Sequence, residues 1–258
     1  MASSDRGGTL YIAGSSSAVP RPGRANSGYL LRAGGYTIAI DFGTGVFSRM
    51  RERLEPTELD AVVVSHMHAD HFFDLVPLRY ALRYEMERGE PLPVYLPPGG
   101  IAIAQTIGNP LKETADFYAG VLDLREYSPI APLAVGDCTI AFAPTVHYIP
   151  AYAMRIETGS GVFGYSADTA PCDAVPNLVR DADLFLCEAA LGPTGTEGSQ
   201  RGHLNAQEAG ELAQRAGAKH LVLTHYSSKS DPKALAQAAG QLFYGKITVA
   251  DDGMEFEL

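Results

Sequence analysis

His66-Met67-His68-Ala69-Asp70-His71 places four side chains that can ligate a metal ion within one short stretch of the chain. The apolar run 61–64 comes directly before it and predicts a buried strand that ends at Ser65. Neutral imidazole and carboxylate are the usual zinc ligands where thiolate is absent, and histidine is the commonest metal ligand. Because three of the seven histidines of the chain fall in this stretch, it predicts a metal site rather than a histidine-rich surface loop.

The composition predicts a globular protein with a sizeable core. The chain has 258 residues, of which 46% are hydrophobic and 19% are charged, and we expect one domain over residues 1–258. The net charge of −10 disfavours nucleic acid and anionic membranes as partners. The three cysteines are odd in number and widely spaced, which favours reduced thiols over disulfides.

The sequence shows no targeting signal. Its first residues have no apolar core of the kind found in signal peptides, and no apolar stretch reaches the roughly 18 residues of a membrane span. We therefore expect a cytoplasmic protein with no membrane partner.

Strand and helix signals are interspersed along the whole chain, which favours an α/β fold with two sheets between helix layers. Apolar residues at helical spacing predict helices at 45–54, 74–88, 206–216 and 232–243. Asn205 and Glu208 resemble a capping box at the start of the third. Short apolar runs predict strands at 10–13, 29–31, 36–41, 61–65, 93–96, 139–143, 152–157, 162–166, 184–187, 221–224 and 247–249.

More metal-capable residues follow other predicted strands. His147, Asp168 and His225 each come at the end of an apolar run or within a few residues of it. Because strand ends meet at one edge of a sheet, where α/β folds place their sites, we expect these three to join the cluster at 66–71.

The candidate ligands exceed what one zinc ion can use, because a zinc site takes four. Two metal ions that share a bridging carboxylate and a bridging water would use all of them, and such pairs suit displacement at phosphorus or at a carbonyl. The spacing alone does not assign ligands to ions. The candidates are His66, His68, Asp70, His71, His147, Asp168 and His225.

These motifs resemble the metallo-β-lactamase superfamily. Residues 66–71 match its His-x-His-x-Asp-His motif, and Asp41-Phe42-Gly43 is similar to its early Asp-x-Gly turn. The resemblance runs from Gly14 to His225 and implies a four-layer αββα sandwich. It also implies that His66, His68 and His147 hold one metal, that Asp70, His71 and His225 hold the second, and that Asp168 bridges them.

Three downstream segments resemble the branch that contains the transfer-RNA 3′-processing endonuclease, RNase Z, and related phosphodiesterases. Residues 166–169 are similar to its Ser-Gly-Asp-Thr motif, with Ala167 in place of glycine. Residues 185–190 and 202–209 are similar to its His-Glu-Ala-Thr and Gly-His-(Ser/Leu)-Thr-x-x-Glu-Ala motifs. The substituted positions in these two segments are Cys187, Ala190 and Asn205.

The resemblance implies catalytic roles for Asp70, Glu188 and His203. In this branch the histidine that matches His203 lies beside the metals and protonates the leaving oxygen, and Glu188 would orient it. A metal-bridging hydroxide would be the nucleophile, oriented or deprotonated by Asp70. The expected cofactors are two divalent ions, Zn²⁺ ahead of Mn²⁺ or Fe²⁺.

The spacing of the ligands argues against transfer RNA as the substrate. RNase Z holds transfer RNA with a long arm between the ligands that match His147 and Asp168, whereas here only residues 148–167, with two predicted strands, lie between them. We therefore expect hydrolysis of a phosphodiester in a small molecule, with a carboxylic ester, thioester or lactone as the alternative. A non-catalytic metal-bound binding protein is disfavoured, because it would usually have lost some ligands.

Some neighbouring residues allow two interpretations. Arg21 and Arg24 either meet an anionic substrate or are solvated, and Tyr148 and Tyr226 either line the pocket or pack. The apolar face of the predicted helix 74–88 fits a homodimer, as is common in the family, and fits core packing equally well.

Overall fold

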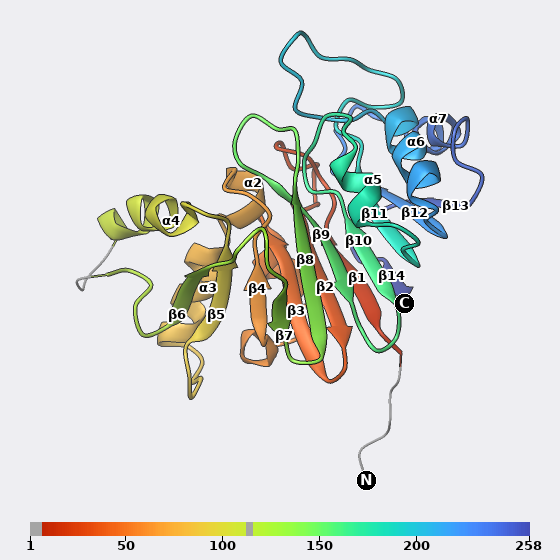
Figure 1. Cartoon of the computed structure of the whole chain (residues 1–258). Coiled ribbons are helices and arrows are strands. Elements are labelled where there is room, and N and C mark those ends of the chain that lie inside the picture. The colour runs from red at the N-terminus through yellow and green to blue at the C-terminus, as the bar shows by residue number, and fades with distance from the viewer. Residues whose placement is uncertain (1–6, 112–115) are drawn as a thin grey trace.

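The computed structural model describes residues 7–111 and 116–258, which form two seven-stranded sheets (Figure 1). The first sheet has the order β14 (Glu255–Glu257), β1 (Thr9–Gly14), β2 (Gly28–Ala33), β3 (Tyr36–Phe42), β4 (Ala61–Val63), β5 (Leu92–Leu96), β6 (Leu122–Glu126). The second has the order β13 (Lys246–Val249), β12 (His220–Thr224), β11 (Leu184–Glu188), β10 (Val162–Tyr165), β9 (Tyr152–Glu157), β8 (Cys138–Pro144), β7 (Leu133–Val135).

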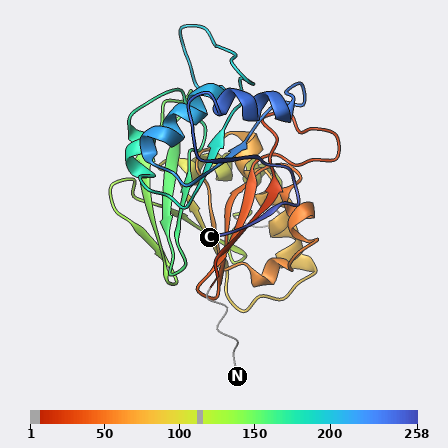
Figure 2. The ribbon, with the colours of Figure 1, turned by 90° about the vertical axis from the view of Figure 1, so that its right-hand side faces the viewer.

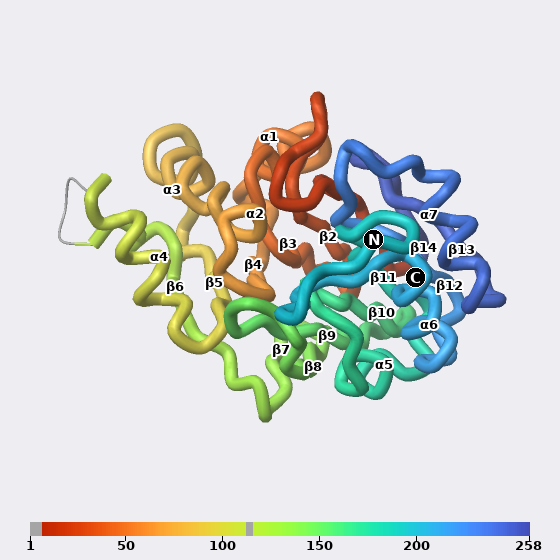
Figure 3. Tube along the Cα trace, turned by 90° about the horizontal axis from the view of Figure 1, so that it is seen from above, coloured from red at the N-terminus to blue at the C-terminus, as the bar shows by residue number. Residues whose placement is uncertain are grey.

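Helices cover the outer faces of both sheets, so the fold has four layers, as the views in Figures 2 and 3 show. This confirms the predicted αββα sandwich. The first sheet is covered by α1 (Val46–Met50), α3 (Leu75–Tyr84) and α4 (Gly100–Gly108), and the second by α5 (Ala174–Leu178), α6 (Ala206–Ala216) and α7 (Pro232–Ala239). The short helix α2 (Ala69–Phe72) lies beyond the end of β4. Two 3-10 turns are Pro56–Glu58 and Asn109–Leu111.

Apolar cores fill the spaces between the layers. Successive residues of a strand face opposite sides, so Val62 packs against the helices of the first sheet while Val63 packs against the second sheet. This double burial explains why β4 is apolar at every position. The apolar face of α3 carries Leu75, Leu78 and Leu82, which also lie in the core. This supports core packing, and the homodimer stays a prediction.

Parallel pairing brings the site-bearing strand ends together. In the first sheet β3 to β6 are parallel neighbours, and in the second β10 to β13 are. Parallel neighbours end at the same edge of a sheet. The two edges are joined directly, because His66 forms an isolated bridge with Ala151 and Tyr152 N donates to Ser65 O at 3.2 Å.

Most predicted elements are present, but three helices are shorter than predicted. The helix at 206–216 has the predicted bounds, whereas α1, α3 and α7 end at Met50, Tyr84 and Ala239. The strands β6, β7 and β14 were not predicted, because all three are edge strands that carry exposed side chains. All three cysteines are free, as predicted. Among the described residues, no helix has the length and apolar character of a membrane span.

The capping box of α6 gives a first testable prediction. Asn205 Oδ1 accepts from Glu208 N at 2.9 Å, and Asn205 N donates to Glu208 Oε2 at 3.0 Å. Asn205→Ala should lower the free energy of unfolding by about 1 kcal/mol, because the first turn loses its acceptor. Denaturant titration followed by circular dichroism measures this. Glu211→Ala, at an exposed position of the same helix, should change stability by less than about 0.5 kcal/mol; equal losses would contradict the role of the cap.

Candidate metal centre

The seven predicted ligands gather where strands of both sheets end. His66 and His68 lie between β4 and α2, and the single turn of α2 carries Asp70 and His71. The remaining three come from the second sheet. His147 follows β8, Asp168 follows β10 and His225 follows β12.

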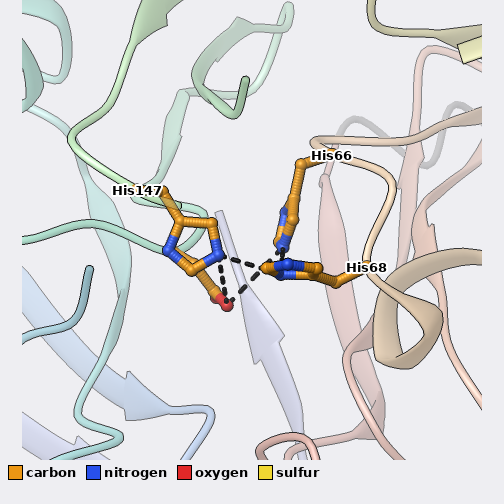
Figure 4. Close-up of side chains that lie close together, drawn as sticks. His66, His68 and His147 are labelled. Carbon is orange, nitrogen blue, oxygen red and sulfur yellow. Dashed lines mark hydrogen bonds and ion pairs between the residues drawn. The ribbon is translucent and has the colours of Figure 1, made fainter. Parts of the chain in front are cut away.

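One group consists of three imidazoles and a carboxylate. His68 Nδ1 lies 3.2 Å from His66 Nε2 and 2.9 Å from His147 Nε2. Figure 4 shows these rings turned toward one another. Asp168 Oδ2 lies 3.6 Å from His66 Nε2 and 3.8 Å from His147 Nε2. The four donor atoms lie within 4.8 Å of one another, a spacing that could hold a metal ion.

A second group shares Asp168 with the first. Asp70 Oδ2 lies 3.2 Å from His225 Nε2 and 3.5 Å from His71 Nε2. Asp168 Oδ2 lies 3.4 Å from His71 Nε2 and 3.5 Å from His225 Nε2. Asp168 therefore has the position that the resemblance implies for a bridging ligand.

The donor atoms suit divalent cations. Within the described chain, His71 Nε2 and Asp168 Oδ1 are buried without a hydrogen-bond partner. Such atoms cost about 1–3 kcal/mol each if nothing replaces their lost water. A bound cation would satisfy both, and nitrogen and oxygen donors without thiolate suit Zn²⁺, Mn²⁺ or Fe²⁺.

Burial and neighbouring charges place most of these groups in the protonation state that a metal requires. Burial lowers the pKa of His66, His68 and His147, which leaves the imidazoles neutral. Burial raises the pKa of Asp168, but the adjacent His225 and His71 outweigh it, and the pKa lies well below its usual range. The carboxylate is therefore ionised and able to bind a cation.

Asp41 supports the second group from behind. Its Oδ2 accepts from His71 Nδ1 at 2.7 Å, from Tyr165 Oη at 2.6 Å and from Ser65 Oγ at 2.9 Å, and its Oδ1 accepts from Ser65 N at 2.7 Å. Asp41 is fully buried. A carboxylate on the far nitrogen of a ligating histidine fixes the orientation and tautomer of the ring.

A separate histidine–carboxylate pair lies beside Asp168. His203 Nδ1 donates to Glu188 Oε1 at 3.0 Å and lies 3.9 Å from Asp168 Oδ2. Glu188 is fully buried and also accepts from Thr169 N at 2.8 Å and Ala190 N at 3.1 Å. Burial lowers the pKa of His203, but the hydrogen bond and charge of Glu188 outweigh it and raise this pKa to about 9. The pair therefore favours the protonated form of His203.

A cavity of roughly 700 Å³ adjoins the first group, large enough for a small molecule. Tyr148 forms part of its wall and is 52% exposed. Tyr226, in contrast, is buried and donates to Ala250 O at 2.8 Å, so it packs. The lining residues are Val146, His147, Tyr148, Ala170, Pro171, Ser199, Gln200 and Arg201.

Arg21 and Arg24 are engaged within the protein. Arg24 Nε lies 2.6 Å from Asp251 Oδ1, and Arg21 Nη2 lies 3.2 Å from the same oxygen. The guanidinium of Arg21 also lies 4.3 Å from the centre of the Tyr226 ring. Both arginines are ion-paired with Asp251, so neither is simply solvated.

Sequence reasoning missed two supporting residues. Tyr165 donates to Asp41, and Glu197 accepts from the backbone N–H of His203. Neither belongs to a motif with a chemical signature, because a strand tyrosine and a loop glutamate are ordinary in any sequence.

Comparison with known proteins agrees with this geometry. The chain is 34% identical to "Probable metallo-hydrolase YhfI" of Bacillus subtilis over 96% of this chain and 99% of the relative. The crystal structure of YhfI, described as a metallo-beta-lactamase fold protein, superposes with a TM-score of 0.88, at 30% identity, over 98% of this chain and all of that one (100%).

More distant relatives share the fold. Ribonuclease Z of Mycobacterium bovis is 28% identical over 94% of this chain and 95% of its own length. A structure described as a diphosphatase from the PhnP family has a TM-score of 0.75 at 18% identity, over 97% of this chain and 98% of that one. The family described as "Beta-lactamase superfamily domain" matches residues 36–226. The chain therefore belongs to the β-lactamase superfamily, as one of its metallo-hydrolases.

Proposed function

We propose that the protein is a phosphodiesterase that acts on a small molecule with the help of two divalent metal ions. The observation that carries the proposal is the buried Glu188–His203 pair beside Asp168. Asp168 belongs to both groups of candidate metal ligands. A protonated imidazole next to its carboxylate is suited to protonate a leaving oxygen. Two relatives are named for cleavage at phosphorus, a ribonuclease and a diphosphatase, which supports the choice of bond.

The two ions would occupy the two groups of donors. We assign one to His66, His68, His147 and Asp168, and the other to Asp70, His71, Asp168 and His225, with Zn²⁺ as the expected metal. When bound, such a pair lowers the pKa of water and offsets charge on the phosphoryl group. Asp70 lies at the rim of its group, about a tenth exposed, where it can also accept a proton from an attacking water.

His203 supplies the proton that the leaving group needs. Because Nδ1 is held by Glu188, Nε2 is the ring nitrogen left to donate. Alkoxides are poor leaving groups, and general acid catalysis contributes typically 10²–10⁴-fold. Glu188 stabilises the imidazolium and keeps the ring oriented between proton transfers.

The fold around the site favours a small substrate. The strands β9 and β10 pair as an antiparallel hairpin and fill the space between His147 and Asp168 where RNase Z inserts its arm. The cavity beside His147 is of small-molecule size. The net charge of −10 offers no general attraction for a polynucleotide.

A substrate panel tests the reaction class. We expect turnover of bis(p-nitrophenyl) phosphate and of a cyclic nucleotide that is abolished by chelation and restored by Zn²⁺ or Mn²⁺. Chromogenic and chromatographic assays measure it, with an acyl thioester and a lactone in parallel. Metal-dependent turnover of the thioester or lactone alone would replace the proposal with acyl hydrolysis. No metal-dependent turnover of any of them would favour a binding protein.

Replacing the proposed acid tests its role. His203→Ala should lower kcat for an alkyl phosphodiester by about 10²-fold or more, while both metals remain bound, because the acid is not among the assigned ligands. Kinetics and elemental analysis of the same preparation measure both. His220→Gln is the matched control, because His220 is the one histidine outside the site and contacts Thr248. Loss of metal in parallel with activity would refute the acid assignment.

The support from Asp41 should be visible in metal affinity. Asp41→Asn leaves His71 Nδ1 without its carboxylate, and we expect about 10–100-fold weaker binding of one of the two metals. Titration of the metal-free protein by calorimetry separates the two binding events. Asp60→Asn is the control, because among the described residues the Asp60 carboxylate accepts only a backbone bond from Thr37 N, at 2.7 Å. Unchanged affinity for both metals in Asp41→Asn would contradict this role.

A further inference from the structure

The segment between β11 and α6 carries His203 and one wall of the cavity but contains no helix or strand. Its base is fastened by backbone bonds, from Leu191 N to Leu204 O at 3.0 Å and from Ala206 N to Gly192 O at 2.8 Å. Between these points residues 193–203 form a long loop, called the excursion below, that extends beyond both sheets in Figures 1 and 2. Side-chain contacts of this loop therefore help to set where the chain returns to His203, among them that of Arg201 Nη2, which donates to His203 O at 3.2 Å.

Glu197 makes such contacts with both of its carboxylate oxygens. Oε2 accepts from Gly202 N at 2.8 Å and from His203 N at 3.2 Å. Oε1 accepts from the hydroxyl of Tyr148 at 2.6 Å. Hydrogen bonds to an ionised carboxylate are stronger than those between neutral groups. One side chain thus joins the excursion to the loop after β8.

The groups that Glu197 holds belong to both parts of the proposed mechanism. Gly202 O accepts from His147 Nδ1 at 2.8 Å, so the same peptide segment orients a metal ligand. Tyr148 follows His147 directly, and its ring lies so close to Gly202 that a Cβ there would approach within 2.6 Å. The rings of Tyr148 and His203 meet edge to face, with centroids 5.8 Å apart.

We propose that Glu197 is a positioning residue that fixes the proposed general acid, His203, over the leaving group. It holds the backbone of His203 on one side and the cavity wall at Tyr148 on the other. Glu188 fixes the direction of the imidazole, and Glu197 fixes the place from which that imidazole projects. This inference rests on the proposed role of His203, and displacing a catalytic group by about 1 Å can cost up to 10²-fold.

The test compares leaving groups of different basicity. The substrates are methyl aryl phosphodiesters whose phenols range from 4-nitrophenol, which leaves without a proton, to unsubstituted phenol, which needs one. Glu197→Ala should lower kcat less than about twofold with 4-nitrophenol and about tenfold or more with phenol, because only the second reaction uses the acid. Glu197→Gln keeps one oxygen acceptor and should lose less than Glu197→Ala.

Two further variants and a measurement of metal content make the result specific to Glu197. Thr196→Ala, an exposed neighbour in the same segment, should match the wild type across the series. His203→Ala sets the steepest dependence expected, and metal content is measured for every variant. A uniform loss, or none, in Glu197→Ala beside a steep loss in His203→Ala would overturn the inference alone. A flat series in His203→Ala would overturn the acid role on which it rests.

Discussion

The carboxylate of Asp168 lies between the two sheets, with Oδ2 3.4 to 3.9 Å from a ring nitrogen of each of five histidines. Asp168 is almost fully buried, and an uncompensated carboxylate in such a place costs several kcal/mol. The histidines around it come from both sheets, so the full set of its neighbours forms only when both sheets are in place. The site therefore assembles only when the two sheets of the sandwich pack together.

Bringing those residues to one point demands sharp turns at the strand ends. Asp41, Ala167 and His225 have φ values of 55°, 50° and 49°, in the left-handed region that costs a residue with a side chain roughly 1–2 kcal/mol. Each lies in the site or next to a residue of it. Ala167 occupies the position of the glycine in the Ser-Gly-Asp-Thr motif that residues 166–169 resemble, and its left-handed backbone gives a physical reason for a glycine there. The surrounding core must supply the energy that keeps these conformations.

The clustering of the candidate metal ligands could be predicted from the sequence because most of them are local and their residue types are rare. Three of the seven histidines fall within residues 66–71, and each candidate ligand outside this stretch follows an apolar run. The early Asp41-Phe42-Gly43 turn was also visible, although only the structure shows why glycine is needed, since a Cβ at Gly43 would lie 1.9 Å from Asp70 O. Geometry of this kind is long-range and leaves no periodic pattern.

What the sequence could not supply is the set of contacts made by common residues. Edge strands such as β6 and β14 alternate apolar and polar residues over only a few positions because one side faces solvent, so they lack the apolar run that identifies β4. Glu197 also belongs to no pattern that the sequence reveals. Its role depends on a loop that folds back so that its carboxylate reaches Gly202, five residues later. A residue that binds a metal must be one of a few amino-acid types. A residue that positions it needs only the right location in the fold, which the sequence does not show.

The division between these two kinds of residue bears on substrate choice. The buried donors around Asp168 would support the same chemistry on many substrates, because they contact only the reacting centre. The cavity wall is built from Tyr148 and from the excursion that ends at His203, and one peptide at Gly202 connects that wall to His147. A substrate that fills the cavity must therefore contact the same loop that carries the proposed acid, His203. Selectivity in this protein is expected to lie in these two loops, and a change that displaces the peptide at Gly202 will alter the placement of the acid together with the shape of the pocket.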